Sequence, residues 1–241
     1  MGSATGKGSR VARFIVVAAA VVILGLLLVA PAMALDATSL TATARPTTVT
    51  FGQGVMISAV LMDTAQDMAV GGEWVRVEQS ASNTGPWSLL YSVTADAGAY
   101  YYYTGTYIAA VLPVQRTFYR FVYPGSGIYA GATSNVLKVL VKPLLGRSTC
   151  PFKVTRYRSF TVKGHVRPGA PAGPAVRIQV YRHKGSKWVS YATHSAKVTG
   201  TQYSHRFKIA VKGTFKFRAI VSSSAEFVGV KSMYSRVLTV K

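Results

Sequence analysis

The residues that could carry out catalysis are few and are poorly arranged for it. The single cysteine, Cys150, follows Thr149, and all four histidines lie downstream of it. A nucleophilic site pairs a serine or cysteine with a histidine that a third polar group orients. Glu226 is the only acidic residue in 143–241, the part that holds the histidines, and no histidine spacing matches a metal site. We therefore expect no enzyme, no cofactor and no metal centre.

The pair Thr149-Cys150 resembles the Thr-Cys nucleophile of sortases, which are exported transpeptidases. That family carries its histidine before the cysteine and its arginine after it. Here every histidine follows Cys150, so the chain order fails. We expect Cys150 to be a partly buried thiol or the point of an intermolecular disulfide in a homodimer.

Cationic side chains are the strongest functional signal in the sequence. Residues 35–142 contain six basic and six acidic residues, whereas residues 143–241 contain nineteen basic residues and one acid. Such a surplus attracts polyanions in a salt-dependent way. We predict distributed contacts with an anionic wall polymer, glycan or lipid surface. The predicted contact residues are Arg156, Arg158, Arg182, Lys184, Lys187, Arg206 and Lys208.

The spacing of these cations predicts how they are displayed. Alternate residues of a strand share a face, which would pair Arg156 with Arg158 and Arg206 with Lys208. Residues 182–187 are typical of a hairpin tip with Gly185 in the turn. The alternative is a solvated surface that is evenly basic and has no ligand. No motif for sequence-specific nucleic-acid recognition is present.

The elements that position these residues are expected to be strands. Short β-branched and aromatic runs alternate with clusters of Gly, Pro, Asn, Asp and Ser, which predicts an all-β sandwich or barrel. The clearest expected strands are 55–61, 74–78, 88–93, 118–123 and 136–141.

An internal repeat divides the chain after its first 34 residues. Residues 117–120 match 214–218, and Trp87 matches Trp188. Ser134 is matched to Ser235, with three extra residues in the second copy. We predict a neutral domain at 36–142, a linker at 143–149 and a basic domain at 150–241.

The repeated residues resemble the immunoglobulin-like repeats of exported proteins in Gram-positive bacteria, especially actinobacteria. The resemblance implies two tandem immunoglobulin-like sandwiches, which commonly serve as stalks, spacers, adhesive modules or carbohydrate-binding units. It rests on Gly164-His165-Val166-Arg167-Pro168, Trp87, Trp188, Gly98-Ala99-Tyr100, Phe118-Tyr119-Arg120 and Ser134.

The aromatic residues suggest both core and contact roles. Without a disulfide, Trp87 and Trp188 are predicted as the structural core of the two sandwiches. The repeated arginines, Arg120 and Arg218, are interpreted as structural residues that lay their stems on the sheet. In the tyrosine run, Tyr101 and Tyr103 could contact a sugar or a protein, or pair across strands within the sheet.

Residues 1–34 are predicted to be a secretory signal peptide. Basic residues precede an apolar run at 14–30, and Ala32-Met33-Ala34 provides a small-x-small cleavage site before Leu35. The alternative is an uncleaved segment that tethers the chain to a membrane. We therefore expect a secreted or cell-surface protein.

These observations predict an exported, non-enzymatic attachment protein whose basic domain contacts anionic surface polymers. The alternative is a structural stalk or an assembly subunit that contacts other surface proteins through edge strands or exposed tyrosines.

Overall fold

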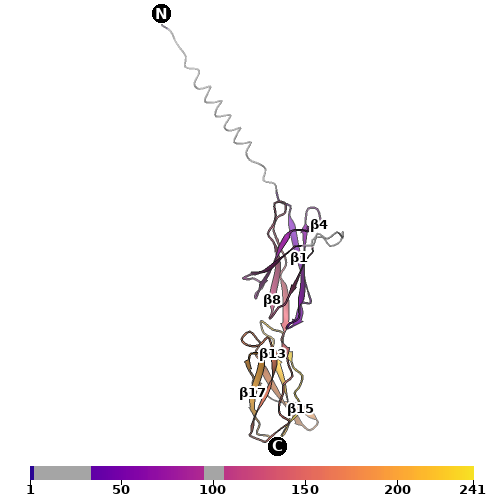
Figure 1. The fold of residues 1–241 in the computed structure, drawn as a ribbon, viewed down its shortest axis with the longest axis vertical. Helices are drawn as coiled ribbons and strands as arrows, with labels where there is room; N and C mark the ends of the chain where they lie inside the picture. The colour runs from indigo at the N-terminus through magenta and orange to yellow at the C-terminus, as the bar shows by residue number, and fades with distance from the viewer. Residues whose placement is uncertain (3–33, 95–105) are drawn as a thin grey trace. The chain divides into compact units, whose positions relative to one another are not determined.

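The computed structural model describes residues 1–2, 34–94 and 106–241. All regular elements in these residues are strands (Figure 1), and none of these residues forms a helix long and apolar enough to cross a membrane. The predicted leader, apart from its ends, and the tyrosines Tyr101 and Tyr103 lie outside the described residues.

The first half of the described chain forms a sandwich of two sheets. Its strands are β1 (Thr38–Arg45), β2 (Thr48–Thr50), β3 (Val55–Asp63), β4 (Met68–Ala69), β5 (Trp74–Ser80), β6 (Ser88–Thr94), β7 (Thr106–Val111), β8 (Thr117–Tyr123), β9 (Ala132–Thr133) and β10 (Leu137–Lys142). One sheet has the order β1-β3-β4, with β7 also on β3. The other has the order β2-β10-β8-β5-β6, with β9 on β8.

The second half forms another sandwich with nearly the same topology. Its strands are β11 (Leu144–Leu145), β12 (Lys153–Val154), β13 (Ser159–Arg167), β14 (Arg177–Lys184), β15 (Lys187–Ser195), β16 (Lys197–Thr199), β17 (Gln202–Lys208), β18 (Gly213–Val221), β19 (Val230–Lys231) and β20 (Leu238–Val240). The four-stranded sheet has the order β11-β13-β17-β16. The six-stranded sheet has the order β12-β20-β18-β14-β15, with β19 on β18.

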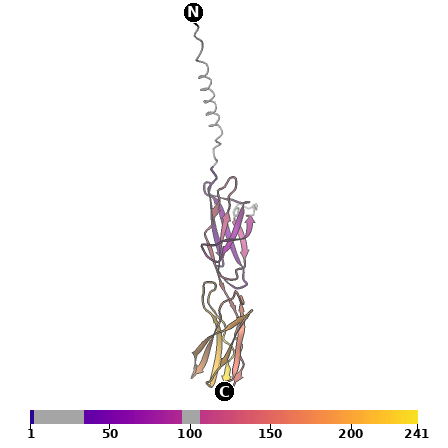
Figure 2. The ribbon, with the colours of Figure 1, turned by 90° about the vertical axis from the view of Figure 1, so that its left-hand side faces the viewer.

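The two sandwiches are therefore copies of one unit. In each, a short early strand pairs in parallel with the last strand, β2 with β10 and β12 with β20, while the other ladders are antiparallel. Two packed sheets, shown from two sides in Figures 1 and 2, are the immunoglobulin-like architecture. This confirms the predicted all-β fold of two tandem immunoglobulin-like sandwiches.

The segment 143–149, predicted as a short linker, contributes a strand to the second sandwich. Leu144 and Leu145 form β11 and pair with Arg167 and Val166 of β13. Ser148 is buried, and its hydroxyl lies 2.9 Å from the hydroxyl of Tyr203. The linker prediction followed from the bounds of the two repeats, and these long-range pairings attach the segment to the second sandwich.

Neither predicted tryptophan belongs to a core. Trp87 and Trp188 are both half-buried, on the outer side of their sheets. The cores are instead formed by inward-facing residues of the central strands, such as Phe121 in the first sandwich and Phe215 and Phe217 in the second, all 0% exposed. The rings lie instead beside outward-facing cations of the central strands, Trp87 beside Arg120 and Trp188 beside Lys216.

The residue of the second repeat that corresponds to Ser134 is not the one that the sequence suggested. Ser134 accepts a hydrogen bond from the backbone of Phe121 at 2.9 Å. Ser232 accepts the equivalent bond from Ala219 at 3.0 Å, after the same spacing of thirteen residues. Ser235 repeats this contact with Phe217. The structural counterpart of Ser134 is therefore Ser232, and the three extra residues follow it.

The burial pattern predicts unequal costs for truncating aromatic residues in the second sandwich. Phe217→Ala should lower the free energy of unfolding by about 3–5 kcal/mol, because it empties a packed core. Trp188→Ala should cost less than half as much, since its ring is partly solvated. Denaturant unfolding of both variants measures the difference. Equal losses would show that Trp188 is a core residue after all.

Candidate polyanion-binding surface

Most of the predicted cationic contacts lie at one end of the second sandwich. Lys184 pairs with Lys187 across the two-residue turn at Gly185, which confirms the predicted hairpin tip. The loop after β12 reaches the same end, because the amide of Arg156 donates to the carbonyl of Lys241 at 2.8 Å. We call this surface the basic end. Its members are Arg156, Arg158, Arg182, Lys184, Lys187, Lys208 and Lys212.

Backbone contacts hold the basic end together. The amide of Tyr157 donates to the carbonyl of Ile209 at 3.0 Å, which joins the loop after β12 to the loop after β17. The guanidinium of Arg182 donates to the carbonyl of Lys212 at 2.9 Å, which joins the β14–β15 hairpin to that same loop. Three separate stretches of sequence thus contribute to one surface.

The cations of the basic end differ in how freely they could contact a ligand. Arg156, Arg158, Lys184, Lys187 and Lys208 are exposed. Arg182 is half-buried, and its Nε atom is buried without a hydrogen-bond partner. It therefore stabilises the end and contributes charge, whereas the exposed lysines and arginines are available for direct contacts.

Arg156 and Arg158 do not share a strand face as the alternation predicted. They lie between β12 and β13, where Tyr157 has a φ of 64° and the amide of Arg158 donates to Thr155. A left-handed residue interrupts an extended chain, so these side chains project from a turn. Arg206 and Lys208 do lie on the outer face of one strand, opposite Thr161 and Ser159 of β13.

The single acid of this sandwich lies at the opposite end. Because β18 runs antiparallel to β14, the loop after β18, which holds Glu226, adjoins the start of β14 at Arg177 and not the hairpin tip. Seven residues of β14 separate these two ends, or about 23 Å at 3.3 Å per residue. No carboxylate side chain of the sandwich therefore offsets the charge of the basic end.

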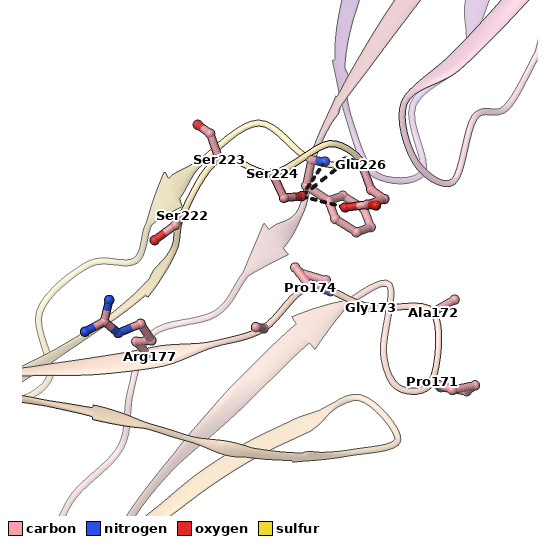
Figure 3. A pocket seen from close by; sticks show the side chains of 11 residues that line it. Pro171, Ala172, Gly173, Pro174, Arg177, Ser222, Ser223, Ser224 and Glu226 are labelled. Atoms are coloured by element: carbon pink, nitrogen blue, oxygen red, sulfur yellow. Dashed lines mark hydrogen bonds between the residues drawn. The ribbon is translucent and has the colours of Figure 1, made fainter. Parts of the chain in front are cut away.

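A hollow of about 550 Å³ beside Glu226 contains no catalytic arrangement (Figure 3). The Ser224 hydroxyl donates to the Glu226 carboxylate at 2.9 Å and accepts from the amides of Glu226 and Phe227, so it organises its own loop. Among the described residues, those lining the hollow include no histidine, cysteine or lysine. In the part of the chain that the structure describes, no histidine is therefore paired with a serine in this hollow.

Two of the four histidines and the cysteine are placed for packing. His194 and His205 lie with ring centroids 4.9 Å apart beside Phe207, and burial, followed by the charge of His205, lowers the pKa of His194. Cys150 is 8% exposed, and its thiol lies 3.5 Å from the carbonyl of Arg236. Among the described residues, no three histidines, cysteines or acids group as metal ligands do.

Sequence reasoning missed a second cationic surface on the outer face of the six-stranded sheet. Lys216 and Arg218 lie there among the rings of Tyr181, Trp188 and Tyr234. We call these five residues the aromatic–cation face. Two differences between the repeats could have indicated this face in the sequence. Gln179 stands where the first repeat has Glu78, and Tyr234 belongs to the extra residues of the second repeat.

Comparisons with known proteins gave matches among solved structures. No protein-family model and no curated protein sequence matches the chain. Among solved structures, the adhesin InvE of Yersinia pseudotuberculosis is 14% identical with a TM-score of 0.40, and the match covers 84% of this chain and 58% of that one. Domains A168–A170 of titin are 13% identical with a TM-score of 0.31, over 84% of this chain and 66% of theirs. The chain thus spans less than two thirds of the adhesin's length.

The burial of Cys150 predicts an unreactive thiol. Burial raises its pKa above the ordinary 9.0, so the thiolate fraction at any lower pH is smaller than that of free cysteine. At pH 8 the folded chain should react with a small disulfide reagent at least tenfold more slowly than free cysteine, and the pH profile should shift upward. Denaturant should abolish the difference. A folded-state rate equal to that of free cysteine would favour the disulfide-linked dimer.

Proposed function

We propose that this protein is an exported, non-enzymatic attachment protein whose basic second sandwich binds anionic polymers of a cell surface. The observation that supports this most strongly is the gathering of exposed cations at the basic end, distant from Glu226. Folding does not require this charge, because the first sandwich has nearly the same topology with equal numbers of basic and acidic residues.

The physical basis of binding would be long-range attraction followed by many weak contacts. Exposed lysines and arginines on loops form a positive field that concentrates polyanions and speeds their association. Because each exposed cation contributes little alone, affinity should fall gradually as charges are removed, without one essential residue. Screening should release the polymer, since the Debye length shortens from about 10 Å at 0.1 M salt to 3 Å at 1 M.

Two variants, each with four cations reversed, can show whether binding depends on where the positive charge lies or only on the net charge. In the test variant Arg156, Arg158, Lys184 and Lys187 become glutamate. In the matched control four exposed cations of the first sandwich become glutamate: Arg45, Arg76, Lys138 and Lys142. Both variants carry the same net charge, so a difference between them must come from the basic end.

The full chain should co-sediment with purified bacterial cell walls at low salt and be released at high salt. Reversal at the basic end should weaken binding at least tenfold, and the control should weaken it much less. Equal losses would show that net charge alone acts. If the unmodified chain stays in solution, attachment is wrong and the role of stalk or assembly subunit takes its place.

A further inference from the structure

The two sandwiches use one equivalent arginine in opposite ways. In the first, Arg120 forms an ion pair with Glu78 at 2.7 Å, and its guanidinium lies 4.4 Å from the centre of the Trp87 ring. A carboxylate and an aromatic face together satisfy this arginine. Its charge is balanced within the protein, so this position offers little to an external anion.

In the second sandwich the balancing carboxylate is missing. Arg218 occupies the position of Arg120, and its cross-strand partner is Gln179 where the first copy has Glu78. The Nη2 atom of Arg218 donates to Gln179 Oε1 at 2.9 Å and to the hydroxyl of Tyr181 at 2.7 Å. Both acceptors are neutral, and the Nε atom is buried without a partner. The positive charge therefore remains available.

A second cation stands beside it where the first sandwich has a buried phenylalanine. Lys216 pairs with Tyr181 across the strands, as Phe118 pairs with Ser80 in the first copy. Its Nζ atom lies 3.7 Å from the ring centre of Tyr234 and 4.5 Å from that of Trp188. Aromatic faces compensate an ammonium only in part, so an anion would bind here with favourable electrostatics.

Three aromatic rings frame the two cations. Tyr181 and Tyr234 meet edge to face with centroids 5.4 Å apart, and both rings lie near Arg218 as well as Lys216. All three rings of the face are half-buried, so each keeps part of its surface exposed to solvent. Tyr234 comes from the extra residues of the second repeat, which the sandwich topology does not need.

We propose that the aromatic–cation face binds an acidic sugar residue of a polysaccharide. Lys216 and Arg218 would hold the carboxylate, and Tyr181, Trp188 and Tyr234 would pack against the sugar ring, which has apolar C–H faces. The Tyr181 hydroxyl donates to Gln179 Oε1 at 3.2 Å, so the amide nitrogen of Gln179 is the group that offers a hydrogen bond to a ring hydroxyl. A chain of polyol phosphates has no ring to fill this frame. This inference rests on the proposed function and specifies its ligand.

The position of the face suits an extended polymer. Outward-facing residues of β14 follow one another at about 7 Å, two residues apart. They run from Arg177 through Gln179 and Tyr181 to His183, which lies beside Trp188, and so reach the hairpin of the basic end. A polysaccharide lying along β14 would therefore place one acidic sugar on the face and others among the exposed lysines of the hairpin.

The decisive variant restores the balance found in the first sandwich. Gln179→Glu should form an ion pair with Arg218, as Glu78 does with Arg120, without emptying any core. Affinity of the full chain for polygalacturonic acid, measured by calorimetry, should fall at least tenfold. Tyr234→Ala should reduce it similarly, and Phe152→Ala, which removes a 69% exposed aromatic of the same sandwich, should leave it unchanged.

Polyglycerol phosphate serves as the comparison polymer because it has charge without a sugar ring. Tyr234→Ala should barely affect its binding, whereas the four reversals at the basic end should weaken both polymers. Unchanged polygalacturonate binding in both Gln179→Glu and Tyr234→Ala would overturn the acidic-sugar site. If the reversals still weakened binding, attachment by the basic end would stand; if they did not, both proposals would fail. Thermal unfolding confirms that each variant is folded.

Discussion

The alternation of side chains along strands is the constraint on which the rest of this structure depends. A sandwich with no disulfide must fill the space between its sheets with every second residue of its central strands. In β18 the inward set includes Phe215, Phe217 and Ala219, all 0% exposed. The residues between them, Lys216 and Arg218, are thereby forced outward together. The core thus determines which positions of β18 can carry cations on the outer face of the sheet.

The sequence was sufficient to predict the strands, the repeat and the hairpin tip, because these follow from local patterns. Observed β3, β5, β6, β8 and β10 each begin within one residue of their expected start. Periodicity two and Gly-rich turns are properties of neighbouring residues, so a single sequence contains them. The gathering of basic residues at one end was not predicted, because it depends on contacts between distant loops, such as the hydrogen bond from Tyr157 to Ile209.

What the sequence could not supply were the contacts between distant segments. Trp87 and Trp188 are predicted as core residues because they are large and repeated, yet size does not determine whether a residue in or just before an edge strand faces inward. The pairing of Leu144 with Arg167 makes a strand of a segment whose composition is typical of a linker. The match of Ser134 to Ser235 followed from the sequence alignment of the two repeats. The hydrogen bond from the Ala219 amide identifies Ser232 as the structural counterpart of Ser134.

The two cationic surfaces of the second sandwich would contribute differently to binding. Exposed lysines at a hairpin tip act over several ångströms and are screened by salt, so they would govern how fast a polymer arrives. Lys216 and Arg218 lie partly desolvated among aromatic rings, where screening is weaker and geometry matters more. They would govern which sugar stays bound. In the first sandwich the equivalent cation, Arg120, is neutralised by an ion pair with Glu78. The fold therefore does not require the arrangement of Arg218, which has no carboxylate partner.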